Sequence, residues 1–207
     1  MQKSCSQHVT LKLPCPTRWS QKYVSLSTVH KFLPQIIQTL EQISEGVSTV
    51  GAEAHQLLRC ARRFDLIFAI AVLRRNLAPC NILAKELQSV SLDISTVLFK
   101  ASAVIKTVGN WQTEAAFAEL WKNCEKNVGE LPGQFDPPEA PRKRKAPARY
   151  EGTGEAAKFD VQTYFRVNVY FPAIDLAIGT LTDRFNENEY SIINKLYKLL
   201  VHRTAKQ

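Results

Sequence analysis

Three residues at the start of a long amphipathic stretch could recognise nucleic acid. Trp19 is preceded directly by Arg18 and followed three positions later by Lys22. A tryptophan face can stack on an unpaired base, and each stacked base contributes about 1–3 kcal/mol. Trp19 can equally be a core anchor where the chain enters a helix. Arg18, Trp19 and Lys22 are therefore candidate nucleic-acid-binding residues, with the anchor as the alternative.

A run of four consecutive basic residues, Arg142, Lys143, Arg144 and Lys145, is the second candidate. It lies in a stretch, 127–158, that is rich in proline and glycine and predicts a long flexible or disordered linker. An exposed basic run is typical of a nuclear import signal or of an arm that contacts phosphates. A solubilising loop is the alternative. We favour the import signal and therefore a nuclear location.

The overall charge agrees with DNA as a partner without requiring it. The 207 residues carry a formal net charge of +8, and the pI is about 9.3. Net charge bears on solubility and on non-specific binding to nucleic acid, and it does not determine the fold. DNA, protein partners and self-association are all candidate interactions.

The sequence offers no pattern typical of catalysis or metal binding. None of the four histidines is followed by another four positions later, and Cys5-x-x-His8 lacks a second pair at zinc-finger spacing. Asp175 and Asp183 are about two helical turns apart, too far to share a metal ion. We therefore expect no enzyme activity, no catalytic residue, no metal or cofactor, and no small-molecule substrate.

Cysteine usage and hydropathy restrict the class further. The five cysteines are widely spaced and include no C-x-x-C pair, which indicates free thiols in a reducing compartment. The longest apolar run, Leu66–Leu73, is too short to span a bilayer. We expect this run to be a buried core segment, and we expect no membrane partner.

Composition and apolar spacing predict an all-α fold, an irregular helical bundle over 20–126. Only eight glycines occur in the chain. Apolar side chains recur every three or four residues from about residue 20. Pro34 removes a backbone hydrogen bond inside this first stripe, so we expect it to kink or split the helix. Residues 1–19 contain a short extended piece and the entry to the helix.

Proline and glycine also predict the later helix boundaries. A central helix is expected from about Ala52 to Leu77, because its middle is apolar on all sides. Pro79 should interrupt it before a short helix over 81–89. A further helix should weaken at Gly109–Asn110 and resume through Trp111.

The C-terminal region, 159–207, is predicted to pack on the bundle. Seven apolar residues from Tyr164 to Phe185 are spaced alternately by three and four positions. The spacing favours the core face of a bundle helix over a dimerising coiled coil, because Pro172 should kink it. Residues 165–171 also alternate as a strand does, which is the alternative there. A last helix is expected over 189–202.

Three blocks of the sequence resemble the middle region of hAT-superfamily transposases. The stretch CPTRWSQKYVSLSTVHKFLPQIIQTLEQIS, Cys15–Ser44, contains C-x-T-R-W followed by F-L-P-x-I-I-x-x-L-E-x-I. The blocks Ile82–Ser95 and Tyr164–Phe185 are similar, in the same order, to the family's L-S-K-x-L-Q … L-D and Y-Y-R … P-x-L-D … L … R-F blocks. Within the superfamily, the chain resembles the domesticated zinc finger MYM-type and THAP-type transposon-derived group of vertebrates.

The resemblance implies a helical insertion domain of a ribonuclease H-like transposase. Residues 1–19 would then be a remnant of the core sheet and the T-R-W entry. In that family the acidic metal-binding triad lies on the core, and no residue here matches it. The family's tryptophan at this motif, matched by Trp19, can stack on a flipped base at the transposon end.

One functional prediction and one alternative follow. The prediction is a non-catalytic fragment of a hAT transposase-like protein that acts as a protein-interaction or scaffold domain, with weak DNA binding. The alternative is a nucleic-acid-binding module that uses Trp19 stacking and the basic run 142–145.

Overall fold

The computed structural model describes residues 19–46, 49–88, 94–140 and 160–186, and omits the side chains of residues 19, 20, 94 and 95. The helices are α1 (Trp19–Ser44), α2 (Thr49–Ala61), α3 (Phe64–Glu86), α4 (Ile94–Gly109), α5 (Glu114–Glu130), α6 (Val161–Phe165), a π-helical turn (Arg166–Tyr170) and α7 (Phe171–Arg184). No strand occurs in these ranges, where one isolated bridge joins Arg63 to Asp136. The predicted all-α helical bundle is confirmed.

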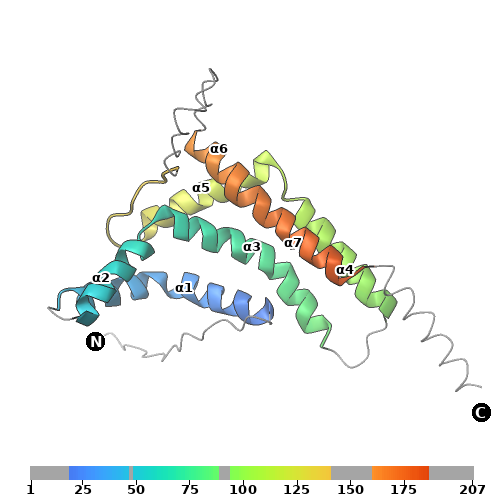
Figure 1. Cartoon of the computed structure of the whole chain (residues 1–207), viewed down its shortest axis with the longest axis horizontal. Helices are drawn as coiled ribbons and strands as arrows, with labels where there is room; N and C mark the ends of the chain where they lie inside the picture. The colour runs from blue at the N-terminus through green and yellow to red at the C-terminus, as the bar shows by residue number, and fades with distance from the viewer. Residues whose placement is uncertain (1–18, 47–48, 89–93, 141–159, 187–207) are drawn as a thin grey trace, which may run out of the picture.

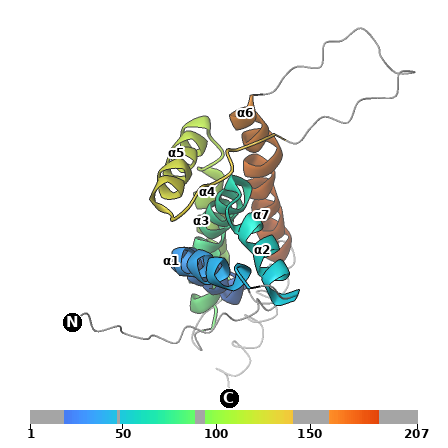
Figure 2. The same ribbon diagram turned by 90° about the vertical axis from the view of Figure 1, so that its left-hand side faces the viewer.

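The central element of the bundle is α3, which packs against α1, α2, α4, α5 and α7. Figure 1 shows α1 along one side of α3, with α2 crossing at its end, and the pair α4 and α7 on the other side. In the perpendicular view of Figure 2, α5 and α7 lie on either side of α3. Because α3 lies at the centre of the bundle, most of its faces are covered by other helices.

An aromatic cluster joins α3 to the helices that follow it. Phe68 is fully buried, and its ring centroid lies 5.5 Å from that of Trp121 on α5 and 5.2 Å from that of Phe165 on α6. Phe64 lies 4.7 Å from Trp121. Edge-to-face and tilted ring pairs of this kind add about 0.5–1.5 kcal/mol beyond burial. The cluster therefore holds α5 and α6 against α3.

Two smaller clusters complete the core. Leu33 and Ile37 of α1 pack with Leu58 of α2 and Ile67 of α3. At the other end of α3, a cluster of buried residues joins it to α4 and α7. Its members are Cys80, Leu83, Ala101 and Leu181.

The predicted break at Pro79 is wrong, because α3 continues through it. The chain breaks instead between α2 and α3, where Arg63 has an extended backbone. The backbone N–H of Asp136 donates to the carbonyl oxygen of Arg62 at 3.1 Å. This hydrogen bond joins the loop after α5 to the point where α2 ends, although the two are far apart in sequence. Buried Cys80 and Leu83, beyond Pro79, offset the hydrogen bond that the proline removes.

The expected split of the first helix at Pro34 does not occur, because α1 is a single element through this proline. Buried Leu33 and Ile37 hold the chain on either side. Trp111 lies in the turn between α4 and α5, not in a helix. The Tyr170 hydroxyl donates to the carbonyl oxygen of Trp111 at 2.8 Å and fixes that turn. The predicted weak point at Gly109–Asn110 is confirmed, since α4 ends at Gly109.

The C-terminal seam is helical, which excludes the strand alternative. Helical structure continues through Pro172, which lies in the first turn of α7 directly after the π-helical turn. The preceding π-helical turn adds one residue to the helix, and the N–H of Phe171 bonds to the carbonyl oxygen of Arg166. This shift leaves Val167 45% exposed and buries Tyr170 instead.

Two predicted boundaries meet the structure only in part. The helix α5 runs to Glu130, so 127–130 are helical and the expected linker can begin only after them. The expected last helix over 189–202 lies outside the described residues, as does most of the linker.

By length and composition α3 could cross a membrane. Here it is the central helix, although the apolar run expected to be buried exposes Leu66 and Leu73.

The position of the core on α7 can be tested by a matched pair of substitutions. Ile174 is fully buried and Leu176, two residues on, is 72% exposed. We expect Ile174→Ala to lower the free energy of unfolding by about 2–5 kcal/mol, and Leu176→Ala to change it by less than about 0.5 kcal/mol. Urea unfolding followed by tryptophan fluorescence measures both. Equal losses in the two variants would contradict the packing of α7.

Candidate functional site

The residues predicted to bind nucleic acid are only partly within the described structure. Trp19 is the first residue of α1, and Lys22 follows it by one turn of the same helix. The two positions therefore lie on one side of α1. Lys22 is half-buried. The side chain of Trp19, Arg18 and the whole run 142–145 lie outside the described residues.

Charge is distributed unevenly along the chain. In the ranges that the structure describes, lysines and arginines are equal in number to aspartates and glutamates. The net charge of +8 therefore comes from residues outside these ranges, with the positive excess in 1–18, 141–159 and 187–207. The helical body as a whole has no excess of positive charge.

Groups suited to metal or nucleophilic chemistry do not converge in the described part. No cluster of three His, Cys, Asp or Glu side chains that could hold a metal occurs there. Burial raises the pKa of the Cys80 thiol to about 11 and that of the Cys124 thiol to about 12. Both are protonated thiols at neutral pH and pack as small apolar side chains.

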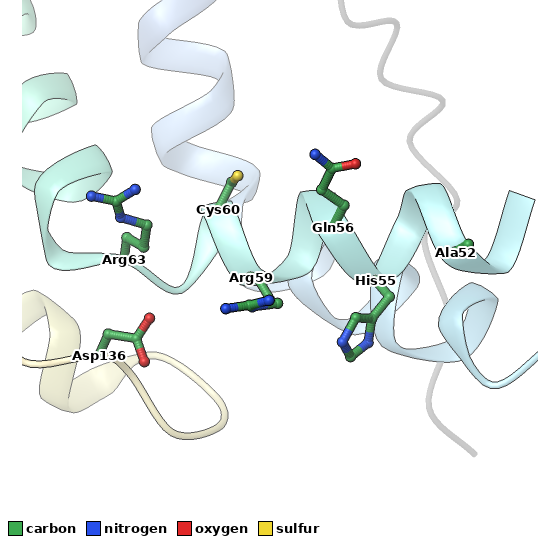
Figure 3. A pocket seen from close by; sticks show the side chains of 7 residues that line it. All are labelled: Ala52, His55, Gln56, Arg59, Cys60, Arg63 and Asp136. Atoms are coloured by element: carbon green, nitrogen blue, oxygen red, sulfur yellow. The ribbon is translucent and has the colours of Figure 1, made fainter.

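A shallow hollow of about 240 Å³ lies beside α2. Figure 3 shows that His55 and Arg59 point to one side of α2, whereas Gln56 and Cys60 point to the other. Arg63 pairs with Asp65, and not with Asp136, which lies below it on the loop after α5. The polar groups therefore do not face a common point, and the hollow has no shape for holding one ligand.

A larger groove of about 390 Å³ lies between α1, α3 and α5. We call it the Arg74 groove. Side chains of all three helices line it, each helix contributing positions three, four or seven residues apart. Its polar lining includes Tyr23, His30, Arg74, Arg75, Asn123 and Asn127. This spacing follows from one face of each helix turning toward the same space.

The charge of Arg75 is used within the fold. Its Nη1 donates to the carbonyl oxygen of Ala116 at 3.1 Å, and its Nη2 lies 3.8 Å from Glu119. Its guanidinium carbon lies 4.9 Å from the ring centroid of Trp111, within cation–π distance. Arg75 therefore ties α3 to the start of α5 and to the preceding turn.

Arg74, the adjacent residue, has no such partner in the described structure. Its Nε is buried and makes no hydrogen bond. An unsatisfied buried donor destabilises a fold by about 1–3 kcal/mol, so such groups are rare and call for a physical explanation. Arg74 is the one lining group whose charge the described fold leaves unused.

His30 reports the electrostatic effect of this arginine. Burial, and secondly the positive charge of Arg74, lower the pKa of His30 below its usual value. His30 is therefore neutral at pH 7, and its ring can donate or accept a hydrogen bond.

The sequence interpretation did not include the Arg74 groove. The available signal was a pair of adjacent arginines, Arg74 and Arg75, directly after the longest apolar run in the chain. Arginine in a buried helix is rarely without a specific partner. That signal could have identified α3 as a helix with a polar task, but not the two helices that supply the rest of the groove.

The different tasks of the two arginines predict different stabilities. We expect Arg75→Gln to lower the free energy of unfolding by about 1–3 kcal/mol, because glutamine cannot replace the charged hydrogen bond and the cation–π interaction. The matched variant Arg74→Gln should have a free energy of unfolding within about 0.5 kcal/mol of the wild-type value, or higher, since Arg74 has no comparable partner in the described structure. Urea unfolding measures both, and equal destabilisation would contradict the assignment.

His30 makes stability depend on pH in a definite direction. Its folded-state pKa lies below the unfolded value of about 6.5, so the unfolded chain binds the proton first as pH falls. The free energy of unfolding should therefore decrease below about pH 6.5. His30→Gln should show a smaller decrease between about pH 7.5 and pH 5 in urea unfolding. An identical decrease in the variant would show that His30 does not contribute.

No protein-family model matches the chain, and no solved structure matches it.

Proposed function

We propose that this chain is a non-catalytic helical domain of the hAT transposase type that serves as a protein-interaction scaffold and binds DNA weakly. The three blocks that carry the resemblance map onto helices of the bundle. The first runs into α1, and the second spans the end of α3 and the start of α4. The third covers the end of α6, the π-helical turn and α7. An insertion domain of a ribonuclease H-like transposase would have such an all-helical body.

The observation that carries the proposal is the neutral helical body. Because the described helices have equal numbers of acidic and basic side chains, we assign DNA affinity to the basic segments outside them, 1–18, 141–159 and 187–207. The run Arg142–Lys145 has the highest local charge of these segments. Attraction of this kind is non-specific and falls steeply with salt. The same run would serve as the nuclear import signal.

Exposed apolar side chains support the scaffold role. Val50 and Leu57 on α2 are exposed, and so are Leu66 and Leu73 on α3. Each pair is separated by two helical turns, so its members lie on one face of their helix. Large apolar side chains aligned along helix faces are typical of protein-protein contacts. The neutral body would thus bind proteins while the basic segments contact DNA.

Two charge variants test this division. One replaces Arg142, Lys143, Arg144 and Lys145 by glutamine. The other makes the same change at four exposed basic residues of the body that have no partner in the described structure. These are Arg59, Lys85, Lys106 and Lys122. DNA affinity is measured by fluorescence anisotropy with labelled duplex at several salt concentrations.

We expect the affinity of the first variant to fall at least about tenfold at low salt. Its salt dependence should be shallower by about 0.9 for each phosphate that is no longer neutralised. The body variant should stay within about twofold of the wild type. Equal losses in both would place the DNA on the helices and contradict the proposal. Trp19→Ala distinguishes the alternative: a selective loss of hairpin over duplex binding would indicate base stacking.

A further inference from the structure

We propose that the Arg74 groove binds a segment of a partner protein through one acidic side chain, whose carboxylate is received by Arg74. The inference rests on the proposed scaffold function and specifies the chemistry of its partner. It gives a function to Arg74, whose charge has no partner within the described fold.

The contrast between two neighbouring arginines is the first argument. Arg75 has a carbonyl acceptor, an acidic neighbour and an aromatic face, all supplied by α5 and the turn before it. Arg74 lines the same groove, and its buried Nε has no acceptor in the described structure. A guanidinium presents a planar set of donors that matches a carboxylate in a bidentate arrangement. No carboxylate pairs with the Arg74 guanidinium in the described structure, and an acidic side chain in the groove would supply that partner.

The remaining lining is suited to polypeptide. Asn123 and Asn127 of α5 and Tyr23 of α1 offer neutral hydrogen-bonding groups in the lining. Ala78 and Leu120 add apolar surface. A peptide presents backbone N–H and C=O groups together with side chains, so it can use both kinds of lining. The volume of about 390 Å³ accommodates a few residues and not a folded domain.

Charge favours one carboxylate over a chain of phosphates. Glu119 also lines the groove and offsets the charge of Arg75 across 3.8 Å. His30 is neutral at pH 7, because burial and Arg74 lower its pKa. The groove therefore offers one positive charge that no neighbouring acidic group offsets, that of Arg74. The helical body around it has no net positive charge. A polyphosphate backbone would meet Glu119 and gain no long-range attraction.

His30 provides a direct readout for the test. The probe is the capped pentapeptide Ac-Ala-Ala-Glu-Ala-Ala-NH₂, with the Gln analogue as its neutral control, added to the full chain. NMR follows the ring protons of His30 and its titration curve. Burial is the larger cause of the lowered His30 pKa and the charge of Arg74 the smaller. A carboxylate on Arg74 would offset the second cause, so the titration curve of His30 should shift on binding.

We expect a saturable shift of the His30 signals with the Glu peptide, at a concentration at least about tenfold lower than with the Gln peptide. Arg74→Gln should abolish the difference between the two peptides. Lys85→Gln, an exposed charge on the same helix, should preserve it. Far-UV circular dichroism confirms that each variant is folded. Equal binding of both peptides, or an unchanged preference in Arg74→Gln, would overturn the proposal.

Two additional probes separate the possible sources of the anion. Inorganic phosphate or duplex DNA that shifts His30 at lower concentration than the Glu peptide would overturn the peptide assignment. The result is independent of the DNA proposal, because Arg74→Gln should leave DNA affinity and its salt slope unchanged. Failure of the peptide test with intact salt behaviour would refute this inference alone.

Discussion

The aromatic cluster around Phe68 is the contact on which the rest of the structure depends. It brings Trp121 of α5 and Phe165 of α6 together against Phe68 of α3, although the three residues are far apart in sequence. Burial of such rings is among the largest single contributions to a core. The same contact places α5 beside α3 and so forms one wall of the Arg74 groove. The groove therefore depends on the core.

Local pattern predicted the helices but not the long-range contacts that limit them. Apolar spacing indicated α1 and the helical course of α7, because burial on one face leaves a period of three to four residues. The break at Arg63 depends on backbone pairing with Asp136, which no local pattern contains. The π-helical turn at 166–170 moved Val167 out of the predicted seam. Proline misled the interpretation at Pro79, where tertiary packing offsets the missing hydrogen bond.

The Arg74 groove could not be predicted from the sequence, because it also depends on long-range contacts. Arg74 and Arg75 are identical in type and adjacent, and only the positions of Ala116, Glu119 and Trp111 make their tasks different. The net charge of +8 describes the whole chain, but the helical body and the segments outside it differ in charge. The helical body is neutral and carries a groove and apolar faces suited to proteins. The positive charge belongs to the basic segments, to which we propose that DNA binds.

The most direct measurement of this separation is a lysine footprint. The full chain is acetylated briefly with and without duplex DNA, and the modification of each lysine is quantified by mass spectrometry. If the basic run holds the DNA, Lys143 and Lys145 will be protected, while the exposed body lysines Lys106 and Lys122 react equally in both samples. Protection of Lys106 and Lys122, with Lys143 and Lys145 still reactive, would place the DNA on the helical body and contradict the account.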